Sequence, residues 1–189
     1  MSFLYVGLDG EMSSADLAEG GKLIQIGIGF SNGESFVSDI NPGKMQWNPI
    51  AAKVHNIPEE RVTQAPLPAE VDGELYDWLV SMGVDPDVRG RNTPVGWNVG
   101  AFDMPFVHDL LPRSASLFSR RTVDLNAICF ALEGRVHNGM PVKASTWKKM
   151  SKAYAIDKIG HENAHDAGWD ALMHIHCFDY LASTVRGVA

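Results

Sequence analysis

Apolar residues recur along the first forty positions with the spacing of β-strands. Residues 3–11 form an apolar run that ends on Asp9 and Glu11, and residues 22–30 are predicted to form a central strand. The Asn-Gly pair at 32–33 is the favoured turn of a short hairpin, so residues 35–40 are expected to return as a third strand. The chain is therefore predicted to open with a three-stranded antiparallel meander.

Helical spacing then alternates with strands. Apolar side chains at Val71, Leu75, Trp78 and Leu79 share one face of a predicted helix over residues 68–82. The other expected elements are helices near 49–56 and 58–62, a strand at 93–97, a helix at 98–111, a strand at 121–125 leading into a helix that ends at 131, a loop at 134–142, a basic helix at 145–154, an irregular segment at 156–163 and a closing helix at 164–185. This order predicts the α/β class, with one mixed five-stranded sheet covered by helices on both faces. We expect residues 1–189 to form a single domain.

Composition narrows the functional classes. The net charge of −7 argues against a basic surface that grips long nucleic acid. The two cysteines, Cys129 and Cys177, stand in apolar, helix-like stretches and are expected to be buried free thiols in a reducing compartment. The sequence contains no signal-peptide pattern and no apolar run of membrane-spanning length. We therefore expect a cytoplasmic protein that does not enter the membrane.

The acids at the end of the first strand are the first candidate site. Asp9 and Glu11 are two residues apart, so both point to the same face of an extended backbone. Like charges on one face repel, and a cation between them relieves the repulsion. Carboxylate oxygens are the ligands that Mg²⁺ and Mn²⁺ prefer. The alternative is a strand that ends in two solvated acids.

Two later segments offer further ligands. Asp103 follows the carboxyl end of the fourth predicted strand, the sheet edge where ligands of α/β proteins gather. His165 stands five residues before Asp170 at the start of the closing helix. The pair His161 and Asp166 has the same spacing, and we favour His165 with Asp170. Several carboxylates can hold two divalent ions about 4 Å apart for phosphate chemistry, and a neutral histidine can take a proton from water.

These motifs resemble those of the DEDDh 3′–5′ exonucleases, the DnaQ-like group, and within that group most closely those of oligoribonuclease. Glu11-Met12-Ser13 is similar to that family's Glu-Met-Thr, and Asn98 stands five residues before Asp103 as in oligoribonucleases. Further similarities are Pro112, the Arg121–Asp124 stretch, and the series Met45, Trp47, His55, Arg61 and Val62. The spacing of Trp47 and His55 and the segments 84–92 and 134–160 depart from the oligoribonuclease pattern.

The resemblance implies an RNase H-like fold and release of nucleoside monophosphates from a 3′ end. It implies that Asp9, Glu11, Asp103 and Asp170 hold two Mg²⁺ or Mn²⁺ ions, with His165 as general base. The implied substrate contacts are Met12 and Ser13 at the terminal nucleotide, Asn98, base stacking by Trp97, Phe102 or Trp47, and a wedge at Leu17. The implied partners are short single-stranded RNA or DNA 3′ ends, and the protein is a possible homodimer.

Two other functions share the same motifs. A proofreading subunit of a DNA polymerase would use the same chemistry, although proofreading enzymes usually have one residue fewer between the Asn and the Asp. A nucleic-acid-binding module without turnover is the second alternative, and the complete set of five chemical residues argues against it. The basic residues Arg120, Arg121, Lys143, Lys148, Lys149 and Lys152 form either a phosphate ledge or a solvated helix face.

Overall fold

A computed structural model describes residues 4–88, 92–160 and 166–187. Its main sheet contains β1 (Leu4–Met12), β2 (Leu23–Gly29), β3 (Ser35–Asp39), β4 (Asn92–Gly96) and β5 (Val123–Asp124) in the order β3-β2-β1-β4-β5. β1 is antiparallel to β2 and parallel to β4, and β4 is parallel to β5. The predicted mixed five-stranded sheet is confirmed, with the acid-bearing strand at its centre.

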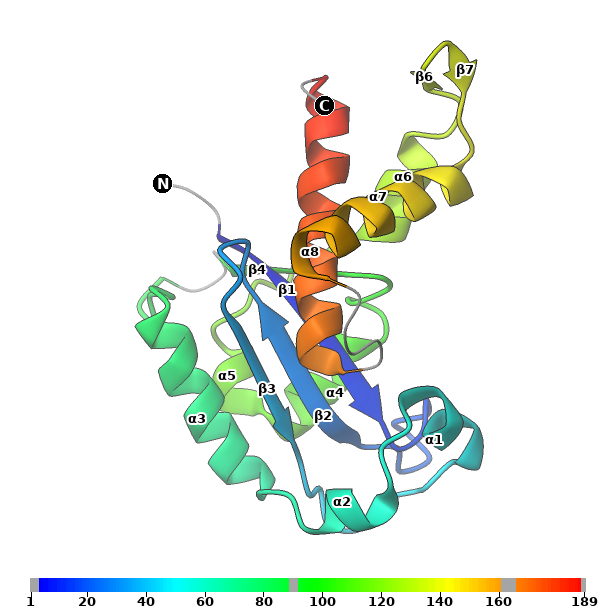
Figure 1. Ribbon diagram of the computed structural model, residues 1–189. Coiled ribbons are helices and arrows are strands. Elements are labelled where there is room, and N and C mark those ends of the chain that lie inside the picture. Colours follow the sequence, from blue (N-terminus) through cyan, green and yellow to red (C-terminus); the bar gives the residue numbers. More distant parts are fainter. Residues whose placement is uncertain (1–3, 89–91, 161–165, 188–189) are drawn as a thin grey trace.

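Helices cover both faces of this sheet, as predicted (Figure 1). The helices are α1 (Pro49–His55), α2 (Glu59–Thr63), α3 (Pro68–Ser81), α4 (Asp103–Leu110), α5 (Pro112–Ala115), α6 (Leu125–Ala131), α7 (Ala144–Ile159) and α8 (Ala167–Arg186). α8 crosses β1 and β2 on one face, while α3, α4 and α5 lie behind the sheet (Figure 1). α6 and α7 pack beside α8 and extend away from the sheet.

Residues of β1 alternate between these two layers. Val6 and Leu8 are fully buried and belong to the core between the sheet and α3, α4 and α5. The intervening residues Gly7, Asp9 and Glu11 face α8, since successive side chains of a strand point to opposite faces. The acids therefore stand on the face where the last helix crosses the sheet.

Glycines allow α8 to lie directly on that face. A Cβ atom built on Gly7 would come within 1.9 Å of the Ala171 carbonyl oxygen, and one on Gly27 within 1.9 Å of the Ala167 oxygen. The helix presents small residues at these contacts, Ala167, Gly168 and Ala171, all of which are buried. The buried Gln25 side chain fixes the start of α8 by accepting a hydrogen bond from the Ala167 N–H at 2.9 Å. This close approach brings Asp170, in the first turn of α8, over β1.

Several boundaries differ from the expected ones. The predicted helix at 98–111 begins only at Asp103, because Asn98 adopts a left-handed conformation (φ 61°) and its carbonyl accepts from the Ala101 and Phe102 N–H groups in a turn. The predicted loop at 134–142 contains a small hairpin, β6 (Val136–His137) and β7 (Met140–Pro141), turned by Asn138 and Gly139 with positive φ. α7 continues through the segment 156–159 that was expected to be irregular.

None of the helices within the described residues combines the length and the hydropathy needed to span a bilayer. Cys129 and Cys177 are both buried and free, as expected from their apolar surroundings.

Candidate nuclease site

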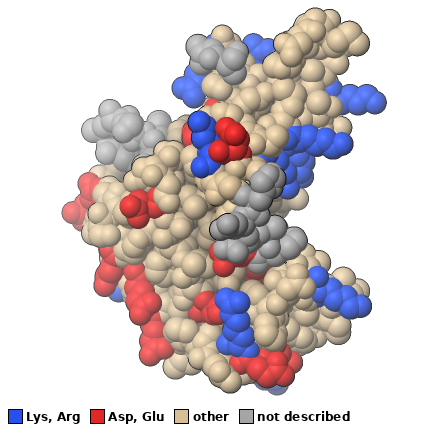
Figure 2. Space-filling model, in the orientation of Figure 1, with Lys and Arg blue, Asp and Glu red and all other residues tan. Residues whose placement is uncertain are grey.

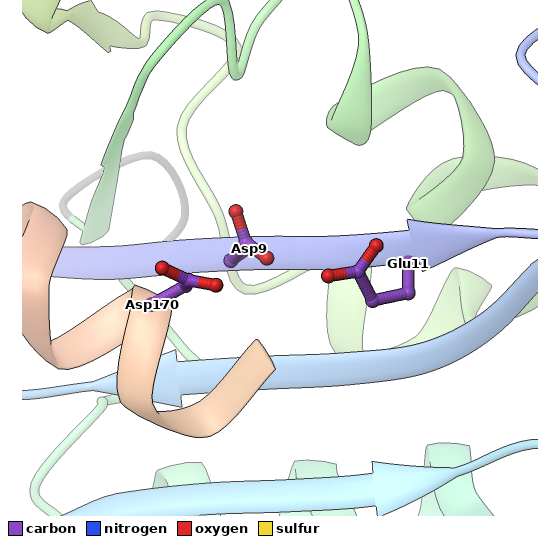
Figure 3. Close-up of side chains that lie close together, drawn as sticks. All are labelled: Asp9, Glu11 and Asp170. Atoms are coloured by element: carbon purple, nitrogen blue, oxygen red, sulfur yellow. The ribbon is translucent and has the colours of Figure 1, made fainter. Parts of the chain in front are cut away.

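Asp9, Glu11 and Asp170 form an acidic cluster at the meeting point of β1 and α8. Each contributes one carboxylate oxygen to a group in which all these oxygens lie within 4.8 Å of one another. The three side chains point toward one another, two from the strand and one from the helix that crosses it (Figure 3). The arrangement is the one expected of ligands around a small cation.

Asp103 joins these acids through the backbone of β1. The pairing of β1 with β4 ends at Gly7, so β1 continues past its parallel neighbour. The Gly10 N–H beyond that point donates to Asp103 Oδ1 at 3.0 Å, and Asp103 itself is buried at the first position of α4. One carboxylate oxygen of Asp103 thus completes the hydrogen bonding of β1, and the same side chain lines the cavity that contains the acidic cluster.

Burial and mutual repulsion hold these acids toward their protonated forms. Burial raises the pKa of Asp9 well above its ordinary value, and the charges of Asp103, Asp170 and Glu11 raise it further. Burial, then the charges of Asp170 and Asp103, raises the pKa of Glu11 to about 8. Burial raises the pKa of Asp103 to about 7, against the opposing effect of the hydrogen bond from Gly10. A cation placed between these oxygens would favour their ionised forms instead.

His174, on α8, lies beside Asp9. Its Nδ1 lies 2.9 Å from the Leu8 carbonyl oxygen, which can only accept, so Nδ1 carries the proton. Burial lowers the pKa of His174 to about 4, which keeps the ring neutral. Its Nε2 then faces Asp9 Oδ1 at 3.8 Å. The sequence offered a signal for this residue, because His174 stands four positions after Asp170 and so shares its helix face.

The acids open into a cavity of about 230 Å³. Trp97, Phe102, Lys152 and His174 line it together with the four carboxylates. Phe102 is 39% exposed and its ring packs on Phe106, with the centroids 5.9 Å apart. The cavity therefore combines carboxylate oxygens, aromatic rings and one cationic side chain.

The other predicted substrate residues are not among those that line this cavity, and each has structural partners. Met12 is buried in the core, and the buried Ser13 hydroxyl accepts from the Lys22 N–H at 3.0 Å. The Asn98 side-chain oxygen accepts from Asn126 Nδ2 at 3.0 Å. Leu17 packs against the core. Contact of these side chains with a nucleotide stays a prediction.

The two candidate histidines of the closing motif, His161 and His165, lie outside the described residues. Their acidic partners are described. Asp166 is the N-cap of α8 and accepts from the Gly168 and Trp169 N–H groups at 3.1 and 3.2 Å. Asp170, one turn later, is the acid that stands beside Asp9 and Glu11.

Comparison with protein-family models gave no match for this chain, and comparison with curated proteins gave no significant match.

Solved structures with a similar fold include several exonucleases. The zinc-bound complex of E. coli ExoI with single-stranded DNA aligns with a TM-score of 0.67 at 18% identity, over 99% of this chain and 42% of that one. Cell-death related nuclease 4 (CRN-4) aligns with a TM-score of 0.65 at 19% identity, over 98% of this chain and 65% of that one. The product-bound structure of exonuclease I aligns with a TM-score of 0.62 at 16% identity, over 97% of this chain and 44% of that one.

The likeness at these identities shows a shared fold, and it confirms the predicted RNase H-like architecture. The chain spans less than half the length of the exonuclease I structures and 65% of CRN-4.

Proposed function

We propose that this chain is a metal-dependent 3′–5′ exonuclease that releases nucleoside monophosphates from single-stranded RNA or DNA ends. The observation that carries the proposal is the convergence of Asp9, Glu11, Asp103 and Asp170 from three separate regions of the chain on one cavity. The fold shared with exonuclease I and CRN-4 supports the same activity.

The four carboxylates would hold two Mg²⁺ or Mn²⁺ ions. Their oxygen-only donor set suits these hard cations. Burial raises the pKa of Asp9, Glu11 and Asp103, neighbouring acids raise the pKa of Asp9 and Glu11 further, and divalent ions would favour the ionised forms instead. Such ions supply activation of water at neutral pH and neutralise charge that develops on a phosphate. The hydrogen bond from His174 Nδ1 to the Leu8 carbonyl fixes the neutral imidazole beside Asp9. His165 is proposed as the general base that takes the proton from the attacking water.

The substrate is proposed to enter as a short single strand. Phe102 offers a partly exposed ring beside the acids on which the terminal base can stack. Met12 and Ser13, at the end of β1, would border the terminal nucleotide. Oligoribonuclease-like selection of short RNA, and dimerisation, belong to this proposal as consequences of the motif resemblance.

The test follows the shortening of 5′-labelled RNA and DNA oligomers of graded length as mononucleotides are released from the 3′ end. We expect a ladder that shortens from the 3′ end with Mg²⁺ or Mn²⁺ and no cleavage with EDTA. Asp9→Asn and Asp170→Asn should each lower the rate by about 100-fold or more, since even the outer partners of metal ligands contribute 10–100-fold. Glu74→Gln, an exposed acid on α3, is the matched control and should leave the rate unchanged.

Absence of cleavage of every single strand with either metal would refute the proposal. Metal-dependent binding without release would instead support the non-catalytic module. A preference for frayed DNA ends over short RNA, together with capture of a polymerase, would support the proofreading alternative.

A further inference from the structure

Two lysines of α7 lie over the aromatic wall of the cavity. The Lys148 ammonium lies 4.3 Å from the centroid of the Trp97 ring, and the Lys152 ammonium lies 5.8 Å from it. The two residues are one turn apart and so share a helix face. Both are partly buried, whereas Lys149 between them is exposed. The helix thus directs both lysines toward Trp97, and Lys152 also reaches the cavity of the acids.

Among the described residues, neither lysine forms an ion pair with a carboxylate at salt-bridge distance. Lys148 donates a long hydrogen bond of 3.4 Å to Asn126 Oδ1, and Lys152 lines the cavity together with Asp9. Figure 2 shows Lys and Arg gathered over the region of α7, while Asp and Glu gather over α3. Part of the positive charge on this face therefore lies over α7, the helix that carries Lys152 to the acidic cavity.

The sum of charges in a metal-loaded site indicates which ligand these lysines would bind. Four ionised carboxylates and two divalent cations sum to zero, so the loaded site would carry no net charge to balance that of a phosphodiester. Lys152 adds one positive charge at the cavity wall, and Lys148 adds a second one turn away. Their separation along the helix, about 6 Å for four residues, is similar to the spacing of neighbouring phosphates on an extended strand.

We propose that Lys148 and Lys152 bind consecutive phosphodiester groups of the single strand, with Lys152 on the group that is cleaved and Lys148 on the next group toward the 5′ end. This inference rests on the proposed nuclease function. Trp97 is then the aromatic support that holds both ammonium groups in place by cation–π contact. A base that stacks on the ring face carrying Lys148 would have to displace that lysine, which leaves base stacking to Phe102.

The kinetic test compares Lys152→Met, Lys152→Arg and Lys148→Met with Lys149→Met. A charge-assisted hydrogen bond to phosphate corresponds to a factor of about 10–100. We expect Lys152→Met to lower kcat by that factor and Lys148→Met to raise KM by about 10-fold. Lys152→Arg should retain activity to within a few fold, because it keeps the charge. Lys149→Met, on the exposed face of the same helix, should behave as the wild type.

The outcomes separate this inference from the proposed function. An active wild type with an unchanged Lys152→Met variant overturns the inference, and so does an equal loss in Lys149→Met, which would indicate a general charge effect. If the wild type does not cleave, binding of a 3′-labelled oligomer in EDTA, followed by fluorescence anisotropy, decides the matter. The Lys148→Met/Lys152→Met double variant should then bind at least 10-fold more weakly than Lys149→Met, and equal binding refutes the inference.

Discussion

The acidic side chains of the cluster ionise less readily in the folded chain than the same side chains do in water. Asp9, Glu11 and Asp103 all have raised pKa values, and burial is the first cause for each. Ionised carboxylates at these positions therefore cost the folded state free energy, and this cost disappears only when the acids are protonated or when cations lie between them. This residue-level conflict has a measurable effect on stability.

Stability in EDTA should fall as the pH rises through the neutral range. Burial raises the pKa of Glu11 from its ordinary value of 4.5 to about 8 in the folded chain. The folded state therefore binds this proton more tightly than the unfolded state does. The free energy of unfolding therefore decreases with pH between these two values. Thermal melts in EDTA from pH 5 to pH 8 measure the effect, and the Glu11→Gln variant should become progressively more stable than the wild type over this range.

Added Mn²⁺ should reverse that trend. Metal binding requires deprotonated carboxylates, so the rise in wild-type Tm on adding Mn²⁺ should be larger at pH 8 than at pH 5. Glu11→Gln should show a smaller rise at both values. Parallel melting profiles of wild type and Glu11→Gln in EDTA would contradict the repulsion described for these acids.

Among the helices and strands, the close packing of α8 on the sheet determines whether the acidic cluster can form. The helix backbone lies against Gly7 and Gly27, and no side chain separates them. Asp170 reaches the two acids of β1 because this distance is so short. The contact therefore contributes to stability and to the metal site together.

Gly27→Ala should damage both properties. The new Cβ would lie 1.9 Å from the Ala167 oxygen and 2.0 Å from its carbonyl carbon, so α8 would have to move. We expect a loss of at least about 1–3 kcal/mol in the free energy of unfolding, measured by urea denaturation, together with weakened metal binding.

Gly73→Ala is the matched control for this change. Gly73 lies within α3, away from the site. The atom nearest to a Cβ built on Gly73 is Arg113 Nη1, at 3.8 Å. This variant should be stabilised by about 0.5–1 kcal/mol through helix propensity. Equal stability of Gly27→Ala and wild type would show that α8 does not depend on the glycine seat.

The sequence predicted these elements well where periodicity and turn chemistry agreed. The meander followed from its strand pattern and Asn-Gly turn, and the four acids could be nominated from their spacing and their resemblance to the DEDDh motifs. The same Asn-Gly pair at Asn138 and Gly139 turns the β6–β7 hairpin, in a segment that was predicted as a loop because it lacks a strand pattern. The turn at Asn98 depends on a left-handed conformation that apolar spacing does not reveal.

The tertiary contacts lay beyond the sequence. Lys152 reaches the cavity only because α7 packs beside α8, and a basic helix face carries no mark of which lysines turn inward. The glycines of β1 and β2 gave no signal of their role, because a strand glycine is equally compatible with a bulge or a turn. Met45, Trp47 and Val62, which suggested the oligoribonuclease resemblance, pack together in a small cluster with Ile24 and Ile57.

For the protein as a whole, charge is distributed unevenly about a net value of −7. Acidic residues cover the α3 side, and basic residues gather near α7 (Figure 2). A ligand with many phosphates would meet repulsion beyond the few positions that the α7 lysines serve. This distribution favours short single strands over long duplexes.

Salt dependence measures how many phosphates are held. With contacts from Lys148 and Lys152 alone, the slope of log K against log salt concentration for a single strand should be about −1.4, which is 0.7 for each of two contacts. Titration of a labelled oligomer at several salt concentrations gives this value, and lengthening the oligomer should leave it unchanged. A slope steeper than about −3 would indicate a longer basic track than the one on α7.

The hydrogen bond between Gly10 and Asp103 affects how relatives of this protein should be interpreted. Because Asp103 satisfies a backbone donor that β4 leaves unpaired, a descendant without turnover would still need an acceptor at that position. Persistence of Asp or Asn there would then report strand integrity and not retained chemistry.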